Sequence, residues 1–150
     1  MNLQPQHPAT LRQYILQRLA AFMAAREART RAHLIDRSDP AAAAAAVHLH
    51  SQENATRLVT NFFAPAFVRR FRCAAPGCQQ RATERCHSLA FPRPRLLQRA
   101  FQEVCGTDDR PYLPISLVEQ RFMELHAEEA VGFRFLCHHC HAQERFMQAA

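Results

Sequence analysis

The chain has 150 residues, enough for one domain or for a small core with an appendage. Its formal charge is +6, and all 19 basic residues are arginine because the sequence contains no lysine. This balance favours a polyanionic partner, most simply nucleic acid, since guanidinium groups suit phosphate. A GC-rich genome, which enriches arginine and alanine codons, is the alternative explanation.

The sequence excludes two broad classes of protein. No apolar run approaches the roughly 18 to 20 residues of a membrane span, so no membrane association is predicted. No secretory signal pattern opens the chain, so its six cysteines do not suggest a secreted disulfide scaffold. We expect reduced thiols and an intracellular protein, in the cytosol or nucleus or within a virion or organelle.

The N-terminal region predicts an arm and two helices. Residues 1–9 lack periodicity, and from Thr10, a candidate N-cap, apolar residues recur at the spacing of one helical face. The opposite face carries arginines that either meet phosphate or are simply solvated; they are Arg12, Arg18, Arg26 and Arg29. Asp39 and Pro40 predict the start of a second helix running to about residue 62, on which His48 and His50 are incidental. The aromatic segment 62–67 ends that helix and leads toward the rest of the chain.

Two cysteine pairs are the strongest signal in the sequence. Cys73 and Cys78 are separated by four residues, and Cys137 and Cys140 by two. Both spacings place two thiolates on one tight turn, and Gly77 supplies the conformational freedom that the first turn needs. Four thiolates predict one structural zinc ion, whereas buried free thiols are the alternative.

Between the pairs, the periodicity predicts a helical hairpin. Residues 81–89 are expected to be a strand or an extended loop, and a helix begins near Pro92 and ends at Gly106. A loop follows, and Ser116 with Glu119 forms a capping box for a helix that ends near Gly132. Residues 133–136 then predict a strand, and 138–147 a terminal helix. His126 and His33, without partners in the sequence, are expected to be surface or capped residues.

These elements predict an α+β fold, mostly α. Residues 1–68 form an N-terminal helical region, and residues 69–150 form a small zinc-stapled ββα core with a helical insertion at 92–131. Arginines near the first pair are the candidate nucleic-acid contacts; they are Arg69, Arg70, Arg72, Arg81 and Arg85.

The order of cysteine pair, strand with histidine, strand, cysteine pair and helix resembles the HNH nucleases of the His-Me finger (ββα-metal) superfamily. Residues 135–144 are similar to the second half of the phage junction-resolving endonuclease VII, and residues 82–87 to small HNH-like proteins of large DNA viruses. The resemblance covers about residues 71–147 and does not extend to the N-terminal helices.

The resemblance implies specific roles. His87 corresponds to the general base that activates water for phosphodiester hydrolysis, and Cys86 and His141 correspond to ligands of a second divalent metal, Mg²⁺, Mn²⁺ or Zn²⁺. Cys86 departs from the family pattern, because a thiolate suits zinc better than magnesium.

The sequence therefore leaves two functions open. One is a metal-dependent HNH-like endonuclease or a close derivative of one. The other is a non-catalytic zinc-binding protein that keeps the scaffold as a packing or nucleic-acid-binding module, in contact with other proteins of a large assembly such as a virion or an organellar ribosome.

Overall fold

The computed structural model describes residues 3–29 and 34–149, and it confirms the predicted α+β class with a majority of helix. The helices are α1 (Pro8–Arg29), α2 (Pro40–Glu53), α3 (Ala55–Phe62), α4 (Pro65–Val68), α5 (Arg93–Thr107), α6 (Ile115–Leu125) and α7 (His138–Ala149), with a 3-10 helix η1 (Glu129–Val131). The strands are β1 (Leu34–Asp36), β2 (Glu84–Cys86), β3 (Tyr112–Pro114) and β4 (Arg134–Leu136).

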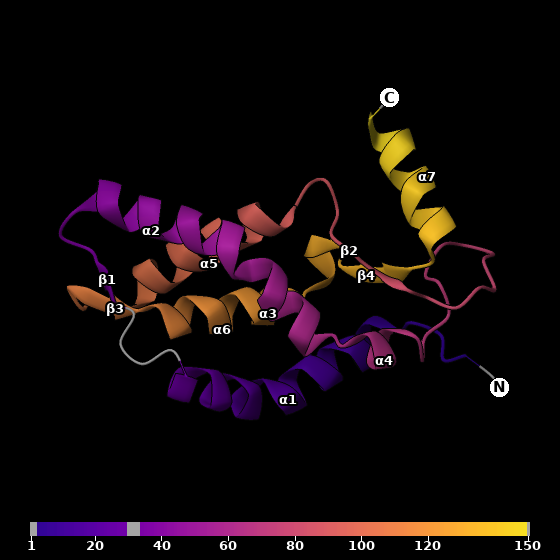
Figure 1. Ribbon diagram of the computed structural model, residues 1–150, viewed down its shortest axis with the longest axis horizontal. Coiled ribbons are helices and arrows are strands. Elements are labelled where there is room, and N and C mark those ends of the chain that lie inside the picture. The colour runs from indigo at the N-terminus through magenta and orange to yellow at the C-terminus, as the bar shows by residue number, and fades with distance from the viewer. Residues whose placement is uncertain (1–2, 30–33, 150) are drawn as a thin grey trace.

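The long helices are stacked side by side. α5 packs against both α2 and α6, and α6 packs against α1, so that α2, α5, α6 and α1 follow one another from top to bottom in Figure 1. The β1–β3 pair lies at the left end of this stack, and the β2–β4 pair lies toward the right, where α7 projects from the body. Among the described residues, no helix is both long enough and apolar enough to span a membrane.

One hydrophobic core joins the N-terminal helices to the insertion. Ile15 of α1, Phe62 of α3 and Phe122 of α6 are each fully buried in the same cluster. The predicted aromatic lead toward the cysteine pairs is also present, since the Phe63 ring lies 4.9 Å from that of Phe133 and 5.6 Å from that of Phe135. The inner faces of the N-terminal helices are therefore occupied within the chain.

The predicted start of α2 and the predicted end of α5 agree with the structure, whereas the helix expected to end near Gly132 ends at Leu125. The carboxylate of Asp39 accepts hydrogen bonds from the backbone N–H groups of Ala41 and Ala42 at 3.1 and 3.2 Å, which confirms the predicted cap. The first helix begins at Pro8 rather than at Thr10, because the carbonyl of His7 accepts the N–H of Thr10 at 2.9 Å. α5 continues one residue past Gly106.

The single helix expected from 40 to 62 is two helices that meet at Asn54. α2 is rich in alanine and buries Ala43 and Val47, whereas α3 has a pronounced apolar face that includes Leu58 and Phe62. A break lets each segment turn its own apolar face inward, which one continuous helix would not allow. The prediction of one helix was wrong for this reason.

The capping box predicted at the start of α6 does not form. α6 begins at Ile115 with Pro114 as its N-cap and without a side-chain cap, so Ser116 lies inside the helix. Glu119 is fully buried instead, and its carboxylate is paired with the Arg26 guanidinium of α1. Arg26 is thus engaged in an ion pair within the chain, with 23% of its side chain exposed, and the side chain of Arg29 lies outside the described residues.

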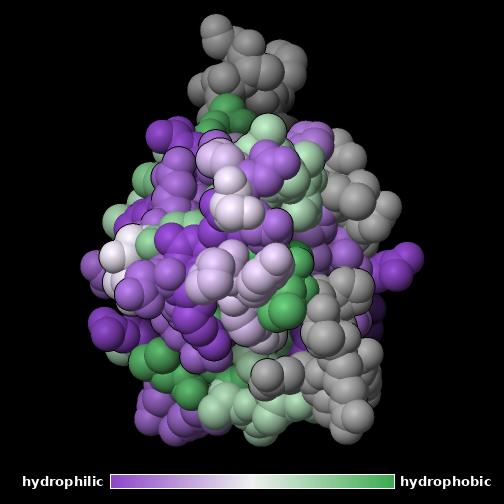
Figure 2. All heavy atoms as spheres, turned by 90° about the vertical axis from the view of Figure 1, so that its left-hand side faces the viewer, coloured by the Kyte–Doolittle hydropathy of each residue, from purple (hydrophilic) through white to green (hydrophobic). Residues whose placement is uncertain are grey.

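The sequence predicted the strands of one of the two sheets but not those of the other. β2 and β4 fall within the predicted extended segments and pair antiparallel, with Arg85 opposite Phe135. β1 and β3 were not predicted; they pair with Ile35 opposite Leu113, and both of these side chains are buried. Figure 2 shows that the molecular surface at the β1–β3 end is mainly hydrophilic, with separate apolar patches. Leu34 and Tyr112, in these two strands, are 53% and 55% exposed.

The N-terminal arm is held to the strands near the cysteine pairs. Gln4 forms a parallel bridge with Phe71, and the side-chain amide of Gln6 donates to the carbonyl oxygens of Arg72 at 2.7 Å and Phe135 at 2.6 Å. The oxygen of the same amide accepts the N–H of Phe135 at 2.9 Å. Gln6 therefore links the first cysteine loop to β4 through three hydrogen bonds.

Candidate metal centre

The four paired cysteines come together as the sequence predicted. Their Sγ atoms all lie within 4.8 Å of one another, and those of Cys78 and Cys137 are 4.0 Å apart. In a tetrahedral site with zinc–sulfur bonds of about 2.3 Å, neighbouring sulfurs are about 3.8 Å apart. None of the six cysteines forms a disulfide. The cluster can therefore hold a metal ion, and its dimensions suit zinc.

The first cysteine pair is shaped by the loop between α4 and β2. The backbone N–H of Cys73 donates to the carbonyl of Gln80 at 2.7 Å, and that of Cys78 donates to Ala75 at 3.1 Å. An isolated antiparallel bridge between Arg72 and Arg81 closes the loop. Gly77 has φ +77°, a backbone conformation that a side chain would strain, so this glycine permits the turn.

The second pair lies where β4 runs into α7. Cys137 follows the last residue of β4, and Cys140 lies in the first turn of α7 with its N–H directed to the Cys137 Sγ at 3.4 Å. The N–H of Ala74 donates to the carbonyl of Phe135 at 3.0 Å, which ties the two cysteine segments together. Backbone contacts thus help to position the four thiols.

The thiols affect one another's ionisation strongly. Burial raises the pKa of Cys137, but hydrogen bonds from the Cys140 backbone and the neighbouring thiols outweigh it and hold the pKa below its usual value. The hydrogen bond with Cys137, together with burial, raises the pKa of Cys140 to about 12. Four thiolates this close repel one another, and a divalent cation is the species that removes this repulsion.

Cys86 and His141, the two further ligands implied by the family resemblance, have different surroundings. Cys86 is buried beside the four cysteines, with its Sγ 3.7 Å from the carbonyl oxygen of His87. His141 Nδ1 lies 3.0 Å from Glu84 Oε2. In residues 3–29 and 34–149, the four cysteines form the only group of three or more such ligands close enough to share an ion. Cys86 and His141 therefore do not form a second group of that kind.

Glu84 holds two histidines of the second cysteine segment. Its carboxylate oxygens lie 3.2 Å from His138 Nδ1 and 3.0 Å from His141 Nδ1. Burial raises the pKa of Glu84, but the hydrogen bonds from the two imidazoles outweigh it and leave the pKa lowered. Glu84 therefore anchors the first turn of α7 to β2.

His87 packs into the helical insertion. Its Nε2 lies 2.9 Å from the Nε2 of His126, which directly follows α6, and its ring lies 5.0 Å from that of Phe133. His126 is buried, and its Nδ1 lies 2.8 Å from the carbonyl oxygen of Phe122. His126 is the C-cap residue of α6, which agrees with the expectation of a capped residue, but a surface position was wrong because a partner 39 residues away in the chain meets it.

The hydrogen bonds of this pair determine its tautomers. A carbonyl accepts only, so His126 carries its proton on Nδ1 and accepts the Nε2 proton of His87. Burial, followed by the nearby charges of His126 and Arg93, lowers the pKa of His87 to about 3, and burial lowers that of His126 to about 4. Both rings are neutral near pH 7, and the Nε2 proton of His87 is committed to His126.

This pair predicts a loss of stability in acid. Both folded-state pKa values lie below the ordinary 6.5 of the unfolded chain, so stability present above pH 6.5 is lost as the pH falls toward 4. Each proton adds a slope of up to about 1.4 kcal/mol per pH unit. The free energy of unfolding can be measured by urea titration between pH 7 and 5. It is expected to fall less steeply with falling pH in His126→Gln than in the native chain. Loss of metal in acid affects the native protein and the variant alike. Equal slopes of unfolding free energy against pH would therefore contradict the prediction that the His87–His126 pair is buried and neutral.

The candidate arginines divide into exposed and internal residues. Arg69, Arg70 and Arg81 are exposed. Arg72 is partly buried and donates to Gln79 Oε1 at 3.0 Å. Arg85 points inward, where its Nε donates to the carbonyl of Phe63 at 2.6 Å and burial lowers its pKa. Three of the five predicted contacts are thus presented to solvent.

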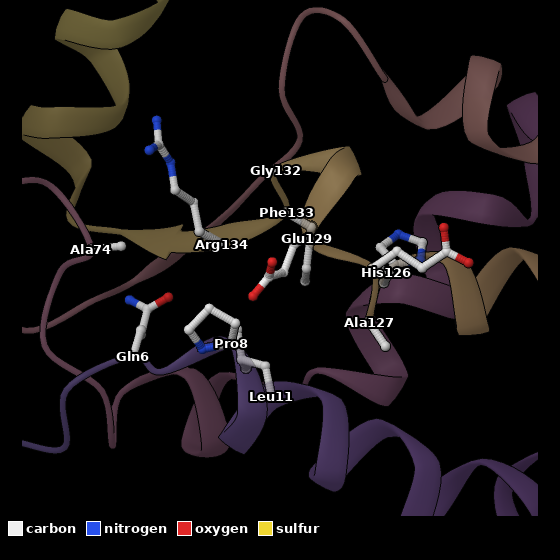
Figure 3. Close-up of a pocket in the computed structure, with 11 residues that line it drawn as sticks. Gln6, Pro8, Leu11, Ala74, His126, Ala127, Glu129, Gly132, Phe133 and Arg134 are labelled. Carbon is white, nitrogen blue, oxygen red and sulfur yellow. The ribbon is translucent and has the colours of Figure 1, made fainter.

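A separate cavity of about 300 Å³ lies between the N-terminal arm, the end of α6 and β4. Figure 3 shows Gln6 and Pro8 on one side of it, Arg134 on β4, and the imidazole of His126 at the far end. The amide of Gln6 is committed to the backbone, and Arg134 is ion-paired with Glu144. The polar side chains that line this cavity are therefore largely engaged in contacts within the fold.

The sequence did not single out Glu84, and it did not indicate the buried partners of Glu119 and His126. Each acts through a residue distant in the chain, as Glu84 does with His141. A lone carboxylate or histidine on a helix or strand carries no local signal of such a partner. His33 lies outside the described residues.

Comparison of the chain with family models, with curated proteins and with solved structures finds no match in any of the three. The interpretation of the centre therefore depends on the geometry described above.

Proposed function

We propose that the chain is a zinc-stapled nucleic-acid-binding protein on an HNH-like scaffold, and that it binds rather than cleaves its partner. The observation that carries this proposal is the environment of His87. A general base must reach the water whose proton it takes. The Nε2 of His87 donates to His126 at 2.9 Å, and the His87 ring packs against Phe133. Burial lowers the pKa of His87 to about 3, so the remaining ring nitrogen, Nδ1, is a poor proton acceptor near pH 7.

The distribution of charge supports a polyanionic partner at the metal end. Between residues 69 and 93 the sequence has six arginines and one acidic residue, Glu84. Glu84 is occupied by His138 and His141, whereas Arg69, Arg70 and Arg81 are exposed. A cluster of exposed guanidinium groups on a metal-stapled loop suits the phosphate backbone, which dominates the affinity of nucleic-acid complexes.

The binding proposal predicts a steep dependence on salt. Affinity for a mixed-sequence oligonucleotide should fall as salt rises from about 50 to 200 mM, because bound arginines release condensed counterions. The double variant Arg69→Gln, Arg70→Gln should bind more weakly and with a shallower slope. The matched control, Arg57→Gln with Arg95→Gln, removes the same charge from exposed positions of α3 and α5. Affinity that does not change with salt would point to a protein partner in a larger assembly.

Endonuclease activity is the second candidate, and the ββα arrangement favours it. β2 and β4 pair antiparallel, and α7 follows β4 directly and packs on β2. A nicking assay on supercoiled plasmid and on branched DNA, with Mg²⁺, Mn²⁺ and Zn²⁺ in turn, separates the two candidates. No cleavage is expected. Cleavage that His87→Ala abolishes while zinc content is retained would overturn the binding-only proposal.

A further inference from the structure

An open groove lies beside the metal centre. Its volume is about 620 Å³, and three of the four clustered cysteines contribute to its lining. Gln80, Arg81 and Thr83, which follow the first pair, and His138 and His139, which lie between the cysteines of the second, complete the lining. No carboxylate is among these residues, so every charged or polar side chain in the lining apart from the thiols is cationic or neutral.

The side chains of the groove are accessible. Arg81 is exposed, and its Nη1 donates to the carbonyl of Arg69 at 2.9 Å, which fixes the guanidinium while the other N–H groups stay available. The side chain of His138 is 86% exposed, and His139 is also exposed. Thr83 is exposed, with its backbone N–H bonded to Leu136 at 3.0 Å. These groups are held on a rigid frame and face solvent.

The charge of the metal centre determines which part of a nucleotide can lie next to the cysteines in the groove. Four thiolates around Zn²⁺ carry a formal charge of about −2, so the cysteine side of the groove repels a phosphate and tolerates an uncharged base. The phosphate is expected on the donors of the lining, the Arg81 guanidinium and the Thr83 hydroxyl. Exposed imidazole rings provide faces on which an unpaired base can stack, whereas the faces of paired bases are covered by their neighbours in a duplex.

We infer that this groove binds one unpaired nucleotide of a single strand, with its phosphate on Arg81 and its base against His139. This inference rests on the proposed function and makes it more specific: the partner is single-stranded nucleic acid. A volume of this size accommodates a small-molecule-sized group such as one nucleotide. Duplex nucleic acid lacks the free base faces that the groove requires.

The test measures fluorescence anisotropy of a labelled 12-residue oligonucleotide, single-stranded or annealed, with the zinc-loaded full chain. The native chain is expected to prefer the single strand. His139→Ala should weaken single-strand binding by roughly 10-fold, within the usual effect of losing one stacked base, with the salt slope unchanged. Arg81→Gln should reduce the salt slope by about 0.7, the value for one phosphate on a single strand.

Matched controls keep the outcomes distinct. His48→Ala on α2 and Arg57→Gln on α3 alter exposed residues outside the groove and should bind like the native chain, and zinc content confirms that each variant is intact. If the groove variants bind normally while Arg69→Gln with Arg70→Gln does not, the groove inference fails and the proposed function stands. Preference for duplex overturns the inference as well. If the native chain binds neither oligonucleotide, the proposed function itself fails.

Discussion

Replacement of Cys137 by serine is expected to abolish metal binding and to unfold the metal end of the chain, which comprises the first cysteine loop, β2, β4 and α7. The native protein should contain one zinc ion per chain, held by four cysteines whose sulfurs lie within 4.8 Å. Structural zinc contributes about 10–16 kcal/mol in isolated zinc-finger peptides, comparable with the whole stability of a typical domain. The β2–β4 pair has three residues in each strand and a small adjoining core, so it depends on this contribution.

The measurement combines metal analysis with thermal unfolding of the native chain and the variant. Cys105→Ser is the matched control, because Cys105 lies on α5 and packs against the main core, apart from the cysteine cluster. It should retain one zinc ion and most of the native stability. If Cys137→Ser keeps both its zinc and its melting temperature, the four cysteines do not form the metal centre.

Arg26→Met is expected to destabilise the helical body by about 3–5 kcal/mol, the usual cost of removing one partner from a buried ion pair. The Glu119 side chain is 0% exposed, and its carboxylate is paired with Arg26 on α1. His50 is the other nearby group, with its Nε2 3.5 Å from Glu119 Oε2. Removing Arg26 leaves a buried carboxylate without its guanidinium partner.

The double variant Arg26→Met with Glu119→Leu tests the cause of this loss. If the cost comes from an uncompensated buried charge, replacing both partners by apolar side chains should recover much of the stability. Urea unfolding gives the free energies for the double-mutant cycle. Arg110→Met is a control, because Arg110 is 53% exposed in its pair with Asp108 and should matter little. A stability of Arg26→Met equal to that of the native chain would show that the pair does not hold α1 on α6.

The sequence by itself determined the features whose causes are local. The cap at Asp39, the turn at Gly77 and the apolar periodicity of α5 each depend on a few neighbouring residues, so each was predictable. The two cysteine spacings likewise predicted a four-thiol cluster, because each pair is formed by its own turn. The resemblance to HNH nucleases and the roles it implies stay predictions.

Only the tertiary structure decided which polar residues meet across the fold. Glu119 was predicted to cap its own helix, but it lies buried against Arg26, 93 residues away in the chain. His87 meets His126, 39 residues away, through their Nε2 atoms at 2.9 Å, a contact that no local pattern indicated, and its role as a catalytic base stays a prediction. β1 and β3, three residues each, pair because Ile35 and Leu113 are buried together. A burial-dependent pairing has no local pattern, since its free energy comes from packing between segments that the sequence keeps apart.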